Sequence, residues 1–139
     1  MSNVLCMRDQ TGNKMKFFNY IEFDSPDAPG SGYDMDPCFL EMLDMARMYA
    51  GIPFVVTSGF RTRQYNNELK RKGYKTSNTS AHLLGKAADI ACTTSADRFL
   101  IISGALEAGF TRIGVASTFI HLDNATTDDD KIEELIWLY

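Results

Sequence analysis

The segment Ser80-Ala81-His82-Leu83-Leu84-Gly85-Lys86-Ala87-Ala88-Asp89 carries the strongest structural signal in this chain. Its end opens a short apolar stretch that predicts a buried strand over residues 87–91. Alternation along that strand places Asp89 between two alanines on one face, which leaves space for a group larger than a side chain. His82 lies seven residues before Asp89, and Gly85 lets the chain turn so that the imidazole returns toward the carboxylate. A buried aspartate is costly unless it is paired, and metal ligation would account for its position.

A second motif, Phe119-Ile120-His121-Leu122-Asp123, predicts another strand with His121 and Asp123 on one face. The chain contains only two histidines, one in each motif. Two imidazoles and a carboxylate are the usual ligands of a catalytic zinc, whereas Mg²⁺ and Ca²⁺ prefer more oxygen atoms. The two motifs together therefore favour a zinc site. The residues leave one alternative open, a scaffold with two buried histidines that would hold no stoichiometric metal.

The remaining sequence predicts a single α+β domain, because its 139 residues, 45% of them hydrophobic, suffice for one core. Apolar periodicity and cap residues predict helices over 37–50, 62–72 and 96–108, and strands over 53–57, 87–91, 112–115, 119–122 and 135–139. A terminal helix competes with the last of these strands. We expect an irregular segment over 1–35 and a core over 36–139. The core should be a small mixed or antiparallel sheet with helices packed on it and the site on one sheet face.

Finer expectations concern the third helix and the cysteines. Ser95 should cap that helix, with Phe99, Ile102 and Leu106 on its inner face. The chain has three cysteines at wide spacing, at positions 6, 38 and 92. An odd number without paired spacing predicts reduced thiols, with the last two buried.

Charge and hydropathy exclude two kinds of partner. A net charge of −4 argues against nucleic acid, since no basic stretch could neutralise phosphates. No apolar run is long enough to span a membrane.

The two motifs resemble the signature of the zinc D-Ala-D-Ala carboxypeptidases and related peptidoglycan endopeptidases, which share their fold with the hedgehog signalling domain. The match is Ser80-x-His82-x-x-Gly85-x-Ala87-x-Asp89, extended upstream by Thr57–Thr62 with Tyr65-Asn66 and downstream by the His121 motif. It covers most of the chain, from about residue 36 to the end, and is most similar to the short branch found in phage and prophage lysis genes and in bacterial cell-wall enzymes. The resemblance implies a Hedgehog/DD-peptidase-like fold and a zinc metallopeptidase that acts on peptidoglycan stem peptides.

The resemblance also assigns roles to individual residues. It implies a zinc-ligand set of His82, Asp89 and His121. It further implies that Arg61 steers the substrate's peptide carbonyl or carboxylate, a role that suits the planar fork of a guanidinium. Ser58 and Ser80 are expected to orient ligands or substrate, and Asn66 is expected to be a structural hydrogen-bonding residue.

One position departs from the family pattern. Better-known branches place a catalytic Glu or Asp three residues before the second histidine, where this chain has Thr118. A threonine cannot accept a proton from water at neutral pH, so Asp123 is the predicted catalytic base. The competing role for Asp123 is to accept the ring N–H of a ligand histidine and fix its tautomer. A third possibility is an acid from the early loop, Glu22 or Asp24.

These inferences predict a zinc-dependent peptidase that cleaves peptidoglycan, as a D-Ala-D-Ala carboxypeptidase or an endolysin-type endopeptidase. The alternative that Thr118 keeps open is a catalytically lapsed, zinc-stabilised cell-wall binding module. The start of the chain lacks the apolar core of a secretory signal. We therefore expect a monomer made in the cytoplasm that reaches the wall through lysis, a phage or a host delivery system. The sequence leaves the cleaved bond and the host open.

Overall fold

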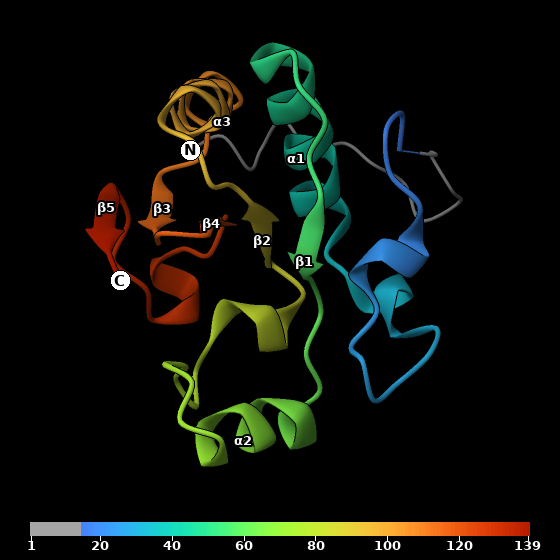
Figure 1. Ribbon diagram of the computed structural model, residues 1–139. Coiled ribbons are helices and arrows are strands. Elements are labelled where there is room, and N and C mark those ends of the chain that lie inside the picture. The colour runs from blue at the N-terminus through green and yellow to red at the C-terminus, as the bar shows by residue number, and fades with distance from the viewer. Residues whose placement is uncertain (1–14) are drawn as a thin grey trace.

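One mixed sheet organises the computed structural model, which describes residues 15–139 (Figure 1). Within those residues the strands are β1 (Val56–Ser58), β2 (Ala87–Ala91), β3 (Arg112–Val115), β4 (Phe119–Asp123) and β5 (Leu135–Leu138). Their order in the sheet is β1-β2-β4-β3-β5. Neighbouring strands run antiparallel, except that β5 runs parallel to β3. The α+β class is therefore confirmed, and the chain ends in a strand rather than in the competing terminal helix.

Three α-helices and four short 3₁₀ helices are also present among the described residues. The α-helices are α1 (Pro37–Ala50), α2 (Arg63–Arg71) and α3 (Ser95–Glu107). Short 3₁₀ helices are η2 (Tyr20–Phe23), η3 (Ser31–Asp34), η4 (Ala81–Leu84) and η5 (Thr127–Asp129). None of the described helices combines the length and the apolar character needed to cross a bilayer.

The ends of the helices follow local sequence signals, with one correction. The carboxylate of Asp36 caps α1 by accepting a backbone N–H of the first turn, and Gly51 closes the helix at a φ of 74°. The N-cap of α3 is Thr94 rather than Ser95, because the Thr94 hydroxyl accepts the N–H of Asp97 at 3.1 Å. Ser95 becomes the first helical residue.

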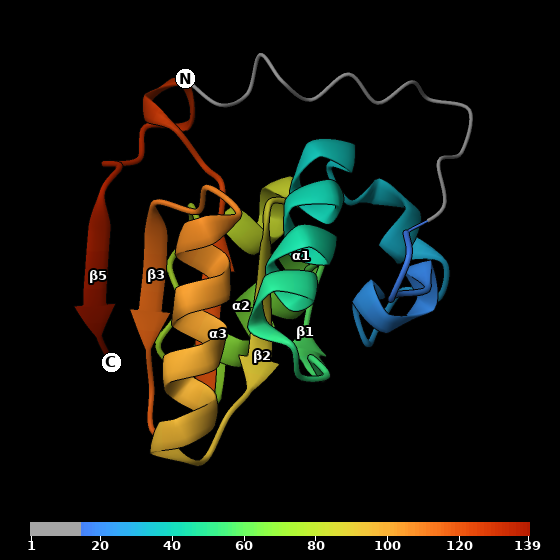
Figure 2. The ribbon, with the colours of Figure 1, turned by 90° about the horizontal axis from the view of Figure 1, so that it is seen from above.

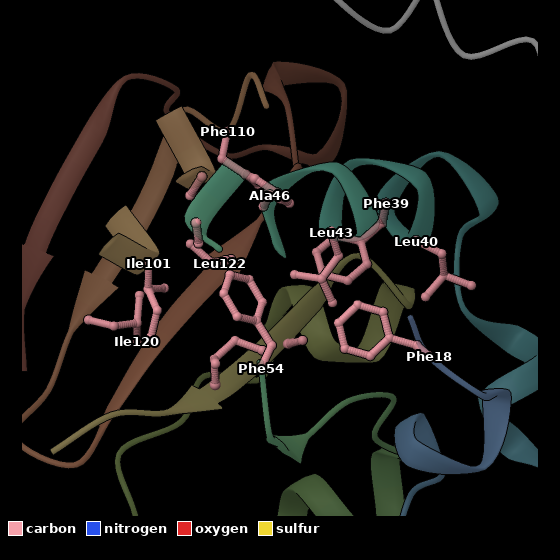
Figure 3. Close-up of a cluster of buried hydrophobic side chains, with 14 of the residues drawn as sticks. Phe18, Phe39, Leu40, Leu43, Ala46, Phe54, Ile101, Phe110, Ile120 and Leu122 are labelled. Atoms are coloured by element: carbon pink, nitrogen blue, oxygen red, sulfur yellow. The ribbon is translucent and has the colours of Figure 1, made fainter. Parts of the chain in front are cut away.

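The core lies between the sheet and the pair α1 and α3, which pack side by side on one sheet face (Figure 2). Aromatic and aliphatic side chains from these helices and from β2, β3 and β4 fill it (Figure 3). Fully buried members include Phe23, Phe39, Leu43, Ile90, Ile101, Ile113, Ile120 and Leu122. Burial on this face leaves the opposite face of β2 and β4 for polar side chains.

The inner face of α3 differs from the prediction. Phe99 and Leu106 are 69% and 52% exposed, and only Ile102 packs partly against the core. The face that meets α1 is built instead from small residues. A Cβ on Gly104 would lie 2.5 Å from the carbonyl oxygen of Ala46, so the two helices approach too closely for large side chains between them.

The prediction for the cysteines holds for one of the two described residues and fails for the other. Cys92 is a free, buried thiol, as predicted. Cys38 is disulfide-bonded and half-buried, so the prediction of a reduced, buried thiol is wrong for this residue. Spacing along the sequence does not reveal such a bond, because the fold decides which sulfur atoms meet. Cys6 lies outside the described residues.

Candidate metal centre

Three side chains of ligand type converge at the polar face of the sheet. His82 comes from η4, the short helix before β2, while Asp89 lies on β2 and His121 on β4 (Figure 1). Asp89 and His121 are direct partners in the antiparallel register of β2 and β4. One nitrogen or oxygen atom from each side chain lies within 4.8 Å of the others. All three residues are buried, with exposures of 2%, 7% and 6%.

Backbone contacts fix the orientation of His82. Its Nδ1–H donates to the carbonyl oxygen of Gly59 at 2.7 Å, which leaves Nε2 facing Asp89 Oδ1 at 3.3 Å. Ser80 Oγ accepts the backbone N–H of His82 at 3.2 Å and so caps η4. Gly85 ends η4 in the left-handed region at a φ of 71°, which turns the chain into β2 as the sequence predicts.

His121 is oriented by two carboxylates. Its Nδ1 lies 2.9 Å from Asp89 Oδ1, and its Nε2–H donates to Asp123 Oδ2 at 2.7 Å. The nitrogen atoms that face Asp89 are therefore Nε2 of His82 and Nδ1 of His121. A set of two imidazole nitrogens and one carboxylate, each imidazole held through its other nitrogen, fits Zn²⁺ in donor type and in orientation.

Asp123 holds the imidazole of His121 in this orientation. The residue is 0% exposed, and its Oδ1 accepts from Arg112 Nε at 2.6 Å and from the N–H of Ala125 at 3.1 Å. Since Oδ2 is bonded to His121, both oxygens are engaged, and Asp123 lines neither cavity at the site. The geometry fits the tautomer-fixing role and gives no support to the predicted role as catalytic base. Strand register explains the difference, because it sets Asp123 opposite Arg112.

The charges of the cluster are strongly coupled. Burial alone would raise the pKa of Asp89, but the charge of His82 and hydrogen bonds from His121 and His82 hold it well below its usual range. Burial lowers the pKa of His82. Burial also opposes protonation of His121, yet its hydrogen bonds to Asp123 and Asp89 raise its pKa to about 9. Without a metal, His121 thus carries the proton that balances the two carboxylates.

Arg61 lies beside the cluster and is held by neighbouring side chains. One terminal nitrogen is 3.5 Å from Asp89 Oδ2, and Nε donates to Ser58 Oγ at 3.2 Å. The other terminal nitrogen donates to Thr76 Oγ1 at 3.0 Å and to Asn66 Oδ1 at 3.4 Å. Asn66 is fully buried, which confirms its structural role. Because these bonds engage most of the N–H groups of the guanidinium, Arg61 keeps at most one edge of that group for hydrogen bonds to a substrate.

Two adjoining cavities, of about 430 and 420 Å³, open onto the cluster. The first is lined by His82, His121, Ser80, Ser77 and Trp137, and the second by Ser58, Glu22, Asp24, Tyr65 and Tyr74. Both are lined by Arg61, Lys75, Thr76, Asp89, Phe119 and Tyr139. Predicted residues Ser58 and Ser80 thus reach the site, each in a different cavity, whereas Thr118 lines neither.

Sequence reasoning missed the aromatic wall of the first cavity. Trp137 lies on β5 and Tyr139 follows its last residue, and their rings lie 5.5 Å from His121 and 5.2 Å from Phe119, respectively. Alternation within the predicted strand over residues 135–139 could have placed them on one face. No local signal identified Lys75 or Thr76, which lie in the loop after α2.

Comparisons with known proteins agree with this geometry. Residues 22–123 match the peptidase M15 family, and the chain belongs to that family. Among solved structures, its fold is similar to that of the Serratia marcescens L-Ala D-Glu endopeptidase ChiX, with a TM-score of 0.53 and 20% sequence identity. That match covers 68% of this chain and 84% of the other. No curated protein matches the chain. The matched family range includes all three residues of the cluster.

Proposed function

We propose that this chain is a zinc-dependent peptidase that hydrolyses peptide bonds in bacterial cell-wall peptidoglycan. The observation that carries the proposal is the convergence of His82, Asp89 and His121 within 4.8 Å in a peptidase M15 fold. The structural similarity to an L-Ala D-Glu endopeptidase supports a peptidoglycan stem peptide as the substrate.

Zinc is the metal that the donor set fits, and it would be held by His82 Nε2, His121 Nδ1 and the carboxylate of Asp89. When bound, such an ion supplies a Lewis acid that polarises a peptide carbonyl and activates water. Asp123 and the carbonyl of Gly59 keep the two imidazoles in the required tautomers.

Two further side chains supply positive charge or a hydrogen-bond donor to the substrate. Arg61 lines both cavities beside Asp89, where its guanidinium stabilises negative charge that develops on a carbonyl oxygen. Tyr139 lines both cavities as well, and burial raises the pKa of its phenol. The phenol therefore stays protonated near neutral pH and can donate a hydrogen bond to the substrate.

Glu22 is the acid that we assign to proton transfer. It lines the second cavity together with Asp24, whose two oxygens accept the N–H groups of Gly30 at 3.0 Å and Gly32 at 2.7 Å. Glu22 Oε2 accepts the N–H of Asn19 at 2.8 Å, and Oε1 has no hydrogen-bond partner among the described residues. Glu22 thus offers a carboxylate oxygen that neither Asp123 nor Asp24 can offer.

An open cleft favours an endopeptidase over a carboxypeptidase. The two cavities adjoin at Arg61 and Asp89, so space for a peptide extends to both sides of the cluster. A carboxypeptidase needs a closed end that holds the terminal carboxylate, and most donors of Arg61 are already engaged by its neighbours. We therefore propose cleavage within the stem peptide or cross-bridge.

A lapsed wall-binding module is the second candidate function. It is favoured by the full engagement of Asp123 and by Thr118, which stands at the usual position of the catalytic acid and lines neither cavity. Such a module would bind zinc and cell-wall fragments without turnover.

The test combines metal analysis with digestion of purified peptidoglycan. We expect one zinc per chain after purification without chelator, and release of fragments whose masses identify the cleaved bond. His82→Ala, Asp89→Ala and His121→Ala should each lose the metal and the activity. Asp129→Ala removes a half-buried acid that pairs with Lys86 outside the site, and should retain both. Turnover by a metal-free variant would rule out the proposed mechanism, and zinc with fragment binding but no turnover would establish the lapsed module.

A further inference from the structure

Arg112 is a buried cation that the proposed chemistry does not use. It lies on β3 with its side chain 10% exposed, at the register position opposite Asp123. Its guanidinium makes three contacts. Nε donates to Asp123 Oδ1 at 2.6 Å, a terminal nitrogen donates to the carbonyl of Ile132 at 2.6 Å, and the planar group lies 5.1 Å from the centroid of the Trp137 ring.

The first contact connects Arg112 to the metal cluster. Asp123 receives Arg112 on one oxygen and the Nε2–H of His121 on the other. A carboxylate held at both oxygens cannot rotate, so the imidazole of His121 is fixed with Nδ1 toward Asp89. Without the arginine, Asp123 Oδ1 would keep only the N–H of Ala125, and the buried carboxylate would lose the cation that compensates its charge on that side.

The other two contacts connect Arg112 to the cleft wall. The bond to Ile132 ties down the segment that leads into β5, and the stacked guanidinium supports Trp137, which lines the first cavity. Only a planar fork can meet a carboxylate edge-on, reach a carbonyl and stack on an indole at the same time. A lysine would preserve the charge but satisfy one of these contacts.

We propose that Arg112 is a positioning residue of the metal centre, which acts through Asp123 on His121 and through Trp137 on the cleft wall. This inference rests on the proposed zinc site but not on the identity of the substrate. It assigns one side chain to two tasks, the orientation of a ligand and the placement of an aromatic surface against which the substrate lies.

The experiment uses the full chain and three readouts, zinc affinity by competition with a chromophoric chelator, tryptophan emission and thermal unfolding of the metal-free protein. Because the chain has a single tryptophan, its emission reports on Trp137 alone. Arg112→Lys should bind zinc ~10-fold more weakly, as expected for a residue that orients a ligand, and should shift the emission while the protein stays folded. Arg112→Met should weaken binding further.

Arg47→Lys is the matched control. Arg47 also stacks on aromatic rings, those of Phe17 and Phe18, and donates to a backbone carbonyl, but it lies on α1 and makes no contact with the cluster. Its variant should keep wild-type zinc affinity and emission. The double variant Arg112→Lys/Asp123→Asn tests whether Arg112 affects zinc binding through Asp123. If it does, the double variant should bind zinc no more weakly than Asp123→Asn alone.

Wild-type zinc affinity and emission in Arg112→Lys would overturn the inference, and so would additive losses in the double variant. A wild-type protein that binds no zinc would overturn both this inference and the proposed function. Weakened binding in the variant, together with a wild type that leaves peptidoglycan intact, would uphold the positioning role and reject the proposed function alone.

Discussion

His121 and Asp123, two residues apart on β4, are joined by a hydrogen bond of 2.7 Å between Nε2 and Oδ2. The bond uses the nitrogen that points away from Asp89, so His121 keeps Nδ1 for the metal position. Such a pair of a carboxylate and an imidazole both fixes the tautomer and increases the basicity of the ligand. The relationship favours a supporting role for Asp123 over the predicted role in proton transfer.

Asp123→Asn tests that assignment. Since asparagine cannot satisfy both His121 and the guanidinium of Arg112, zinc affinity should fall ~10- to 100-fold. At saturating zinc, however, turnover should stay within ~10-fold of wild type, because we assign the proton transfer to Glu22. Activity assays across a zinc titration measure both effects. A loss of turnover by ~10²-fold or more at full zinc occupancy would instead show that Asp123 is the base.

Glu22→Gln should lower turnover by ~10²-fold or more without changing zinc affinity, because the amide keeps the hydrogen bond to Asn19 but cannot take a proton. The measurement is kcat with zinc occupancy determined on the same samples. Glu68→Gln, which alters an acid paired with Arg71 and Lys72 on α2, is the control and should behave as wild type. Unchanged kcat in Glu22→Gln would remove Glu22 from the mechanism.

Arg61→Lys should lower kcat/KM by ~10²-fold, the usual cost of removing a donor to a developing oxyanion. Lysine retains a positive charge near Asp89 but loses the bonds to Ser58 and Thr76 that hold the guanidinium in place. Zinc affinity should change by less than ~10-fold, since the side chain of Arg61 contacts only Asp89 among the candidate ligands, and its backbone bond to His82 is kept in the variant. Steady-state kinetics and chelator competition separate the two quantities. A variant with full activity would show that Arg61 only braces the loop after α2.

Much of this site follows from the sequence because its geometry is local. Strand alternation places Asp89 and His121 on matching faces, and Gly85 supplies the turn that returns His82. The role of Asp123 is harder to predict from the sequence. Strand alternation indicates which sheet face a residue occupies, but it does not identify the residue that pairs with it on the neighbouring strand. The partner, Arg112, is set by the pairing of β3 with β4.

The aromatic wall and the inner face of α3 depend on longer-range packing. Trp137 reaches the site only because β5 joins β3 in parallel at the sheet edge, a pairing that no local pattern specifies. In α3 the apolar periodicity favoured Phe99 and Leu106, whereas the close approach of α1 selected the face that contains Gly104. Helix contacts of this kind are decided by both surfaces together.

The metal-free protein should lose stability as pH rises from about 7 to about 9. The folded-state pKa of His121 is raised from 6.5 to about 9, so its contribution is fully present below 6.5 and is lost as pH rises through about 9. The lowered pKa of His82 reduces the stability of the folded protein only as pH falls below 6.5. The lowered pKa values of Asp89 and Asp123 contribute stability that is lost only as pH falls below 3.8. Urea unfolding of chelator-treated protein at several pH values measures the trend. The zinc-loaded protein is the control, since the metal replaces the Nδ1 proton, and a flat profile without metal would contradict the assignment.

Gly114→Ala should disturb the cleft wall while leaving the ligands in place. Gly114 lies opposite His121 and Trp137 in the sheet, and a Cβ there would stand 2.7 Å from Tyr139 Cε2 and 2.8 Å from Trp137 Cε2. Both contacts are with rigid rings, so the rings must shift from their positions in the cleft wall. We expect kcat/KM to fall ~10- to 100-fold, because small misplacements of a substrate-positioning surface are costly. The tryptophan emission should shift, and zinc affinity should stay within ~3-fold of wild type.

Thr111→Ala, at an exposed position just before β3, controls for general effects of a substitution on the strand. Wild-type kinetics and emission in Gly114→Ala would mean that the two rings do not form the substrate-facing wall.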